Sequence, residues 1–93
     1  MRIKEDEIKV LKESVKERDP YAKIYLFGSR ANDQARGGDI DLLVLSENLT
    51  FKDKLKIKAR IFEFMEVQAI HLIIARDTSD LFVRAVLDEG VPL

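Results

Sequence analysis

The sequence predicts a small α/β (α+β) domain in which helices flank a mixed β-sheet. Segments with helical apolar spacing alternate along the chain with apolar runs of strand length, and no repeat or linker interrupts this alternation. A length of 93 residues leaves room for one domain, residues 1–93. The expected order of elements is helix, strand, turn, strand, helix, strand and helix.

The first half of the chain predicts one helix and two strands. Apolar residues at helical spacing favour a helix over residues 5–18, which Pro20 would end. An apolar run over residues 22–27 predicts a strand that stops at Gly28, and residues 39–45 predict a second strand. The connection between these strands is too short for a parallel crossover, so we expect an antiparallel pair.

The second half of the chain predicts a helix, a strand and a last helix. A Thr-x-x-Asp capping box precedes the helix expected over residues 51–66, and residues 69–75 predict the third strand. The last helix is expected to begin near Asp77 or Ser79. Gly90 would end it in the left-handed conformation that is common after a helix.

The helix expected over residues 51–66 carries two apolar seams and several basic residues. One seam consists of Phe51, Leu55, Ala59 and Phe62, and the other of Ile57, Ile61 and Phe64. Only one seam can cover the sheet, so the other is expected to meet another helix of the chain or a partner. The basic residues indicate a solvated face rather than an RNA-binding surface; they are Lys52, Lys54, Lys56, Lys58 and Arg60.

The composition excludes several classes of protein. Cysteine is absent, which excludes disulfides, a thiolate zinc site and a cysteine nucleophile. The formal net charge of −1 argues against broad binding of nucleic acid. No apolar stretch approaches the ~20 residues of a membrane span, and the N-terminal residues lack a signal-peptide pattern. We therefore expect a cytoplasmic protein without membrane contact.

The residues with the clearest chemistry lie around the connection between the first two strands. Alternation along the second strand places Asp39 and Asp41 on one face, where two carboxylates offer the hard oxygen ligands that suit Mg²⁺. Gly28 and Ser29 follow the first strand. Gly28 has no side chain to block a phosphate, and Ser29 offers a hydroxyl and a backbone N–H that can donate to it. Arg30 can add a charge-assisted contact. The pattern predicts metal-assisted phosphoryl or nucleotidyl transfer.

Two segments carry a resemblance to a known family: Leu26-Phe27-Gly28-Ser29-Arg30-Ala31 and Gly38-Asp39-Ile40-Asp41-Leu42-Leu43-Val44. They resemble the signature of the DNA polymerase beta superfamily of nucleotidyltransferases, in particular the minimal nucleotidyltransferases. The resemblance implies the nucleotidyltransferase fold, ATP or another NTP held by Gly28, Ser29 and Arg30, and one or two Mg²⁺ ions held by the catalytic Asp39 and Asp41. Such proteins often pair with a helical HEPN toxin as its antitoxin, and some transfer AMP to a tyrosine of that toxin.

The third strand departs from the family pattern. Active members place a third carboxylate there between apolar residues, whereas this chain has Ile70-His71-Leu72. Neutral imidazole is a poor ligand for Mg²⁺, so His71 is either a third ligand or a structural residue, with Glu63, Glu66 and Gln68 as alternatives. Two functions stay open: an active transferase, or a weakened nucleotide-binding antitoxin that acts by binding. The partner would be a helical HEPN-type protein or a second copy of the chain.

Overall fold

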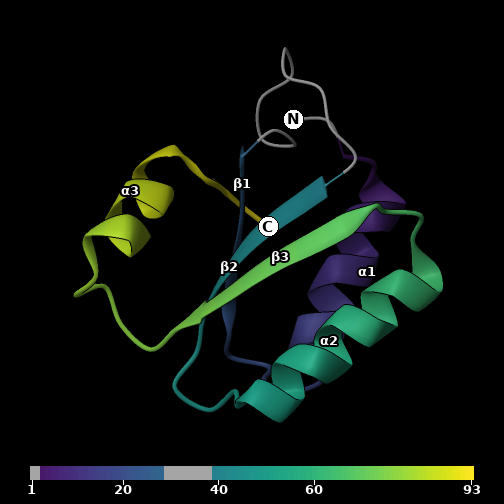
Figure 1. The fold of residues 1–93 in the computed structure, drawn as a ribbon, viewed down its shortest axis with the longest axis horizontal. Coiled ribbons are helices and arrows are strands. Elements are labelled where there is room, and N and C mark those ends of the chain that lie inside the picture. Colours follow the sequence, from purple (N-terminus) through teal and green to yellow (C-terminus); the bar gives the residue numbers. More distant parts are fainter. Residues whose placement is uncertain (1–2, 29–38) are drawn as a thin grey trace.

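The computed structural model describes residues 3–28 and 39–93, which form three helices and a four-stranded mixed sheet (Figure 1). The elements are α1 (Glu5–Lys16), β1 (Lys23–Phe27), β2 (Asp39–Leu45), α2 (Phe51–Phe64), β3 (Ala69–Ala75), α3 (Leu81–Glu89) and β4 (Val91–Pro92). No helix in these two ranges is long and apolar enough to cross a bilayer. The predicted fold class is confirmed.

The sheet has the strand order β3-β2-β1-β4. β1 and β2 pair antiparallel, as their short connection predicts. β2 and β3 pair in parallel through α2, with Asp39 opposite Ala69 and Leu45 opposite Ala75. β4 adds a short antiparallel pairing to the other edge of β1. The sequence did not predict β4, because two residues carry no periodicity.

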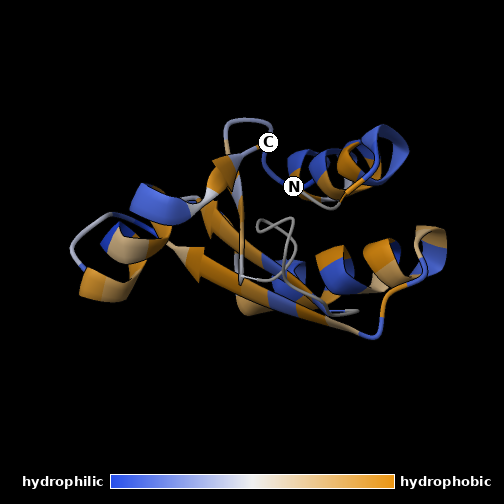
Figure 2. Cartoon of the chain, turned by 90° about the horizontal axis from the view of Figure 1, so that it is seen from above, coloured by the Kyte–Doolittle hydropathy of each residue, from blue (hydrophilic) through white to orange (hydrophobic). Residues whose placement is uncertain are grey.

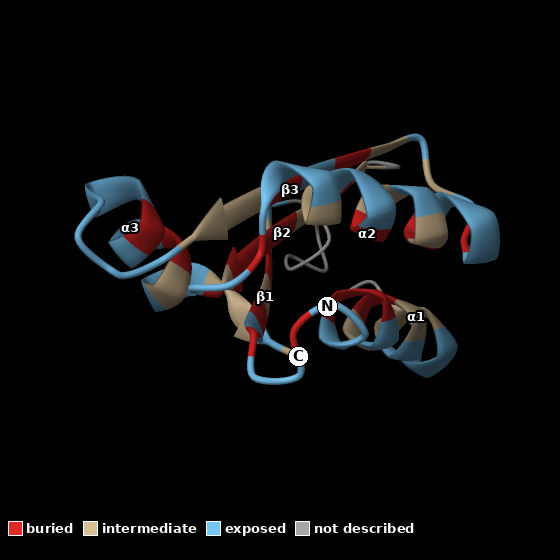
Figure 3. Cartoon of the chain, turned by 90° about the horizontal axis from the view of Figure 1, so that it is seen from below, coloured by how far each residue is buried: buried red, intermediate tan, exposed pale blue. Residues whose placement is uncertain are grey.

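Helices cover the two faces of the sheet unequally. α1 and α2 lie side by side, whereas α3 lies apart from them (Figure 3). The strands are mainly apolar (Figure 2), and most of the core lies between them and the pair α1 and α2. Buried residues of this core include Leu11, Val15, Leu26, Ile40, Leu42, Ile57, Ile61 and Leu72. On the opposite face, α3 packs Val83 and Val86 against Leu43. α3 therefore leaves part of its face of the sheet uncovered.

The capping box predicted at the start of α2 is present. The Thr50 N–H donates to Asp53 Oδ2 at 2.8 Å, and the Asp53 N–H donates to Thr50 Oγ1 at 3.3 Å. α1 and α2 each end two residues before the predicted end, at Lys16 and Phe64. α2 stops because Met65 takes an extended conformation, with φ −136° and ψ 147°, as the chain turns toward β3.

The start predicted for the last helix is wrong. Asp77 Oδ1 accepts the Ser79 N–H at 3.0 Å and the Ser79 hydroxyl at 2.6 Å, so these residues close a turn before the helix. The cap is Asp80, whose Oδ1 accepts the Phe82 N–H at 2.7 Å. α3 therefore begins at Leu81.

The left-handed conformation predicted for Gly90 is also wrong. Gly90 has φ −74° and ψ 160°, because the chain passes directly from α3 into β4. The position needs glycine for another reason. A Cβ there would lie 2.7 Å from the Val86 carbonyl oxygen and 3.2 Å from that of Leu26. Close backbone packing, rather than a positive φ, explains the residue.

Candidate active site

Asp39 and Asp41 lie on the face of β2 that α3 covers only in part. Ile40 and Leu42 are fully buried under α1 and α2, so strand alternation turns the two aspartates to the opposite face. On that face α3 packs over Leu43 and over Phe27, which lies opposite Asp41, and the Asp39 side chain stays 45% exposed. Both carboxylates are partly exposed. We call this open part of the sheet, with Asp39 and Asp41, the acidic face.

Gly28 lies against the acidic face. β1 ends with Phe27 opposite Asp41, and Gly28 follows with φ +71°, a left-handed conformation that favours glycine. A Cβ on Gly28 would overlap Asp41 Oδ2. The position therefore requires glycine twice, for its φ and for the approach of the carboxylate. Ser29 and Arg30, the other predicted phosphate-binding residues, lie outside the described residues.

His71 lies beside both aspartates of the acidic face. The parallel register places His71 beside Asp41, and its Nε2 lies 3.3 Å from Asp39 Oδ2. The His71 side chain is 56% exposed and that of Asp39 is 45% exposed, so the contact remains open to solvent. β3 thus places an imidazole within reach of the acidic face. The sequence predicted the position of His71, but not its contact with Asp39, which depends on the strand register.

The surroundings of Asp41 oppose its charge. Burial raises the pKa of the Asp41 carboxyl above its ordinary value, the charge of His71 lowers that pKa, and the charge of Asp39 raises it. The net direction is upward. A cation bound between the two carboxylates would remove both the repulsion and part of the cost of burial. The site is therefore arranged to favour a bound positive charge.

Residues 9–93 match the family described as "Polymerase beta, Nucleotidyltransferase". The chain belongs to this family. Membership supports nucleotidyl transfer with a nucleoside triphosphate as substrate, and the family generally uses divalent metal ions. No curated protein matches the chain. This nucleotidyltransferase therefore has a supported general activity, while its nucleotide, acceptor and partner belong to the proposals below.

The carboxylates of this nucleotidyltransferase fit a hard divalent cation. Asp39 and Asp41 share one face of β2. The pKa of the Asp41 carboxyl is raised because burial and the charge of Asp39 outweigh the charge of His71, which lowers it. Among the described residues, no three His, Cys, Asp or Glu side chains form a ready-made metal cluster. Mg²⁺ commonly uses one or two carboxylates and takes its other ligands from water and substrate phosphates. Two aspartates meet that requirement.

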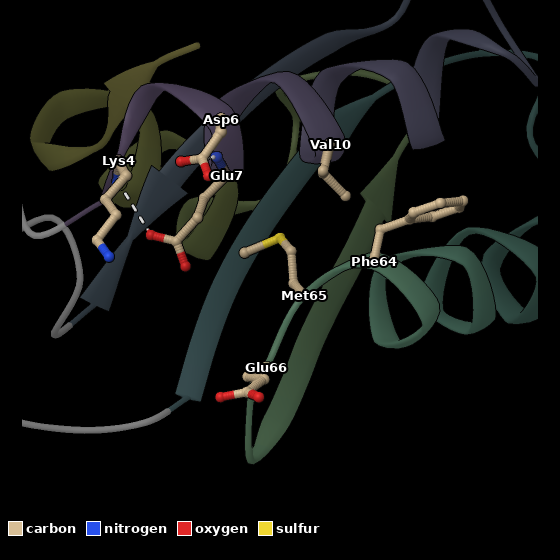
Figure 4. A pocket seen from close by; sticks show the side chains of 7 residues that line it. All are labelled: Lys4, Asp6, Glu7, Val10, Phe64, Met65 and Glu66. Carbon is tan, nitrogen blue, oxygen red and sulfur yellow. Dashed lines mark hydrogen bonds between the residues drawn. The ribbon is translucent and has the colours of Figure 1, made fainter.

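The alternative ligands Glu63 and Glu66 do not reach the acidic face. Glu66 lines a pocket of about 350 Å³ between the start of α1 and the end of α2 (Figure 4). Val10 and Met65 in that pocket contribute to the core beneath the two helices, so it opens on the other side of the sheet. Glu63 lines a second groove between the same helices. Gln68 is exposed just before β3.

Proposed function

We propose that this nucleotidyltransferase transfers AMP from ATP to a hydroxyl group, with Mg²⁺ held by Asp39 and Asp41. The observation that carries the proposal is the acidic face itself: two carboxylates on an open part of the sheet, with Gly28 packed against one of them. Gly28, with Ser29 and Arg30 after it, would hold the triphosphate. Bound Mg²⁺ supplies charge neutralisation for the phosphate oxygens.

The residues of the chain divide the work of this reaction. Asp39 and Asp41 would fix where the positive charge sits, and Gly28 lets the Asp41 carboxylate lie against the end of β1. The acceptor hydroxyl oxygen forms a bond to the α-phosphorus, and the bond from that phosphorus to its bridging oxygen breaks. Pyrophosphate leaves with the electron pair of the broken bond, and the hydroxyl proton passes to solvent. The half-covered face beside α3 leaves space for an acceptor carried on another protein.

The acceptor that we propose is a hydroxyl on a helical HEPN-type toxin, for which this protein would be the antitoxin. The support is the resemblance of the segments around Gly28 and Asp39 to the minimal nucleotidyltransferases. Asp39 and Asp41 are both partly exposed, which is compatible with a substrate surface on a folded protein. The resemblance, and not the geometry, suggests the identity of the partner.

One observation favours a second function, a nucleotide-binding antitoxin with weakened transfer. His71 stands where active members carry an acid, and its Nε2 contacts Asp39. Imidazole is a poor ligand for Mg²⁺, so two aspartates could bind a nucleotide-held ion while transfer slows. His71→Asp distinguishes the two functions. A large gain in transfer supports weakened catalysis in the natural chain, whereas brisk natural transfer with no gain contradicts it.

The experiment that tests the main proposal incubates the full chain with ATP labelled at the α-phosphate and a purified HEPN protein encoded beside it. Label in the partner that requires Mg²⁺ and disappears with chelator is the expected result. Titration calorimetry with ATP, with and without Mg²⁺, separates loss of nucleotide binding from loss of transfer. Transfer that persists unchanged after chelation would overturn the metal assignment.

A further inference from the structure

The apolar stripe of α2, defined as Phe51, Leu55, Ala59 and Phe62, is exposed. Phe51 is 70% exposed, Leu55 52% and Phe62 46%. Ile57 and Ile61, from the other predicted seam, are buried against the sheet instead. Of the two seams, only this second one covers the core. The expectation that another helix of the chain would cover the first seam is not met by α1 or α3.

The side of α2 that faces α1 is marked by Arg60. Its Nε lies 3.0 Å from Glu17 Oε2, and its Nη1 donates to Ser14 Oγ at 3.0 Å. Its guanidinium also lies 5.2 Å from the Phe64 ring centroid, and Phe64 is exposed rather than part of the core. α1 therefore occupies one flank of α2 through polar contacts.

The apolar stripe lies on the opposite flank. Successive residues of a helix are rotated by ~100°, so the stripe covers an arc of roughly 80° that begins about 180° from Arg60. α2 lies beside β3, which is the edge strand of the sheet (Figures 1 and 3). Phe51, Leu55 and Phe62 thus face outward at the β3 edge, away from α1, and Ala59 lies at the rim of the groove beside α1. A helix from another molecule can approach it there without displacing α1.

Lysines border the apolar stripe on both sides. By the same rotation, Lys52 and Lys56 follow one border, and Lys54 and Lys58 follow the other. The acid at this end of α2, Asp53, is engaged by Arg18 Nη2 at 3.0 Å and by the cap hydrogen bonds. Within the described ranges, no ion pair neutralises any of the four lysines. The border is positive along the first two turns of α2, and Glu63 adds one acid to the Lys52 and Lys56 side near the other end of the helix.

We propose that the apolar stripe docks an amphipathic helix of a partner protein that carries acidic residues along both borders of its own apolar face. Apolar contact would supply the centre of this interface, and the lysine borders would select acidic side chains and speed association. A symmetric contact between two copies would bring lysines against lysines. RNA would leave the apolar centre unused. The inference does not depend on nucleotide transfer.

The test uses two synthetic helical peptides with the same leucine face, one bordered by glutamates and the other by lysines. Fluorescence anisotropy measures their binding to the full chain. The glutamate peptide is expected to bind about tenfold or more tightly than the lysine peptide, with the gap shrinking at high salt. Equal affinity for the two peptides would overturn the proposal.

Variants locate the binding. Leu55→Ser is expected to weaken the binding of the glutamate peptide about tenfold. Leu81→Ser, at a position on α3 that is 78% exposed, should leave this affinity unchanged. The pair Lys54→Glu and Lys58→Glu should abolish the peptide preference, because Lys52 and Lys56 keep only one border positive. Circular dichroism confirms that each variant is folded.

Two further results would contradict the proposal. One is an RNA oligonucleotide that binds as tightly as the glutamate peptide. The other is a dimer, seen by sedimentation, that Leu55→Ser dissociates. Because Asp41→Asn leaves the stripe intact, peptide binding by that variant separates this proposal from the proposed transfer activity.

Discussion

The β1–β2 pair has a carboxylate near each of its ends, and the surroundings shift the pKa values of these two carboxylates in opposite directions. At one end Asp19 is 4% exposed, and its Oδ2 accepts the Ser46 hydroxyl at 2.5 Å while its Oδ1 accepts the Tyr21 N–H at 3.0 Å. The bond from Ser46 lowers the pKa of Asp19 more than burial raises it. At the other end, burial raises the pKa of Asp41.

The difference separates a structural carboxylate from one kept for a ligand. Asp19 repays its burial with hydrogen bonds from the protein, so its charge stabilises the fold. Asp41 lies against Gly28, and burial and the charge of Asp39 disfavour its charged form. Such a carboxylate is useful only when something positive binds it. Four experiments test this difference between Asp19 and Asp41.

The largest expected effect is on transfer in Asp41→Asn. We expect the rate to fall on the order of 10³-fold, because the amide cannot replace a charged metal ligand worth several kcal/mol. The free energy of unfolding should not fall, since the substitution removes an unfavourable charge. Transfer assays and urea denaturation measure the two quantities. Asp88→Asn, on the exposed side of α3, is the matched control. An Asp41→Asn variant that is less stable but still active would contradict the assignment of Asp41 to ligand binding rather than to the fold.

Asp19→Ala should produce the reverse result. Loss of the acceptor leaves the buried Ser46 hydroxyl and the Tyr21 N–H without their partner, so the free energy of unfolding should fall by about 2–3 kcal/mol. Transfer per folded molecule should be unchanged. Asp77→Ala removes a comparable turn acceptor at an exposed position and should cost less than about 1 kcal/mol. Equal losses in the two variants would contradict the structural assignment of Asp19.

Gly28→Ala should cost about 1–2 kcal/mol of stability, because an L side chain is strained at φ +71°. The added Cβ should also displace the Asp41 carboxylate and reduce transfer. A double-mutant cycle with Asp41→Ala, measured as the free energy of unfolding, isolates the cost of this overlap. Alanine at position 41 removes the overlapping carboxylate but leaves the backbone strain at residue 28. Additive effects in that cycle would mean that Gly28 and Asp41 do not meet.

The smallest effect is a change in the pH dependence of stability. Because the folded pKa of Asp19 is lowered, its stabilisation is present above the ordinary value of 3.8 and is lost as pH falls through the folded pKa. The stability gap between the natural protein and Asp19→Ala should therefore narrow between about pH 5 and pH 2. Asp41 has the opposite sign, because its pKa is raised. Denaturant midpoints across this range measure the gap, and a gap independent of pH would contradict the assignment.

Local signals predicted much of the fold. The strands over residues 39–45 and 69–75 match the structure, and so does the capping box at Thr50, because each depends on residues close in sequence. The start of α3 was missed because Asp77 and Ser79 are residue types that cap helices as readily as Asp80, which is the actual cap. β4 depends entirely on its contact with β1.

The candidate site was predictable to the same degree. The shared face of Asp39 and Asp41 follows from strand alternation alone. The contact of His71 with Asp39 depends on the register between β2 and β3, and the open acidic face depends on how little of the sheet α3 covers. Which seam of α2 would be buried also depended on where α1 docks, which the helix sequence does not contain.

The parallel register of β2 and β3 has a consequence for how the chain folds. Each residue of β2 pairs with the β3 residue 30 positions later, from Asp39 with Ala69 to Leu45 with Ala75. That separation must be closed, with α2 docked across it, before His71 can meet the aspartates. A nascent chain that has made only β1 and β2 therefore presents two repelling carboxylates without their neighbour. The contact between His71 Nε2 and Asp39 Oδ2 therefore reports that β2 and β3 have paired.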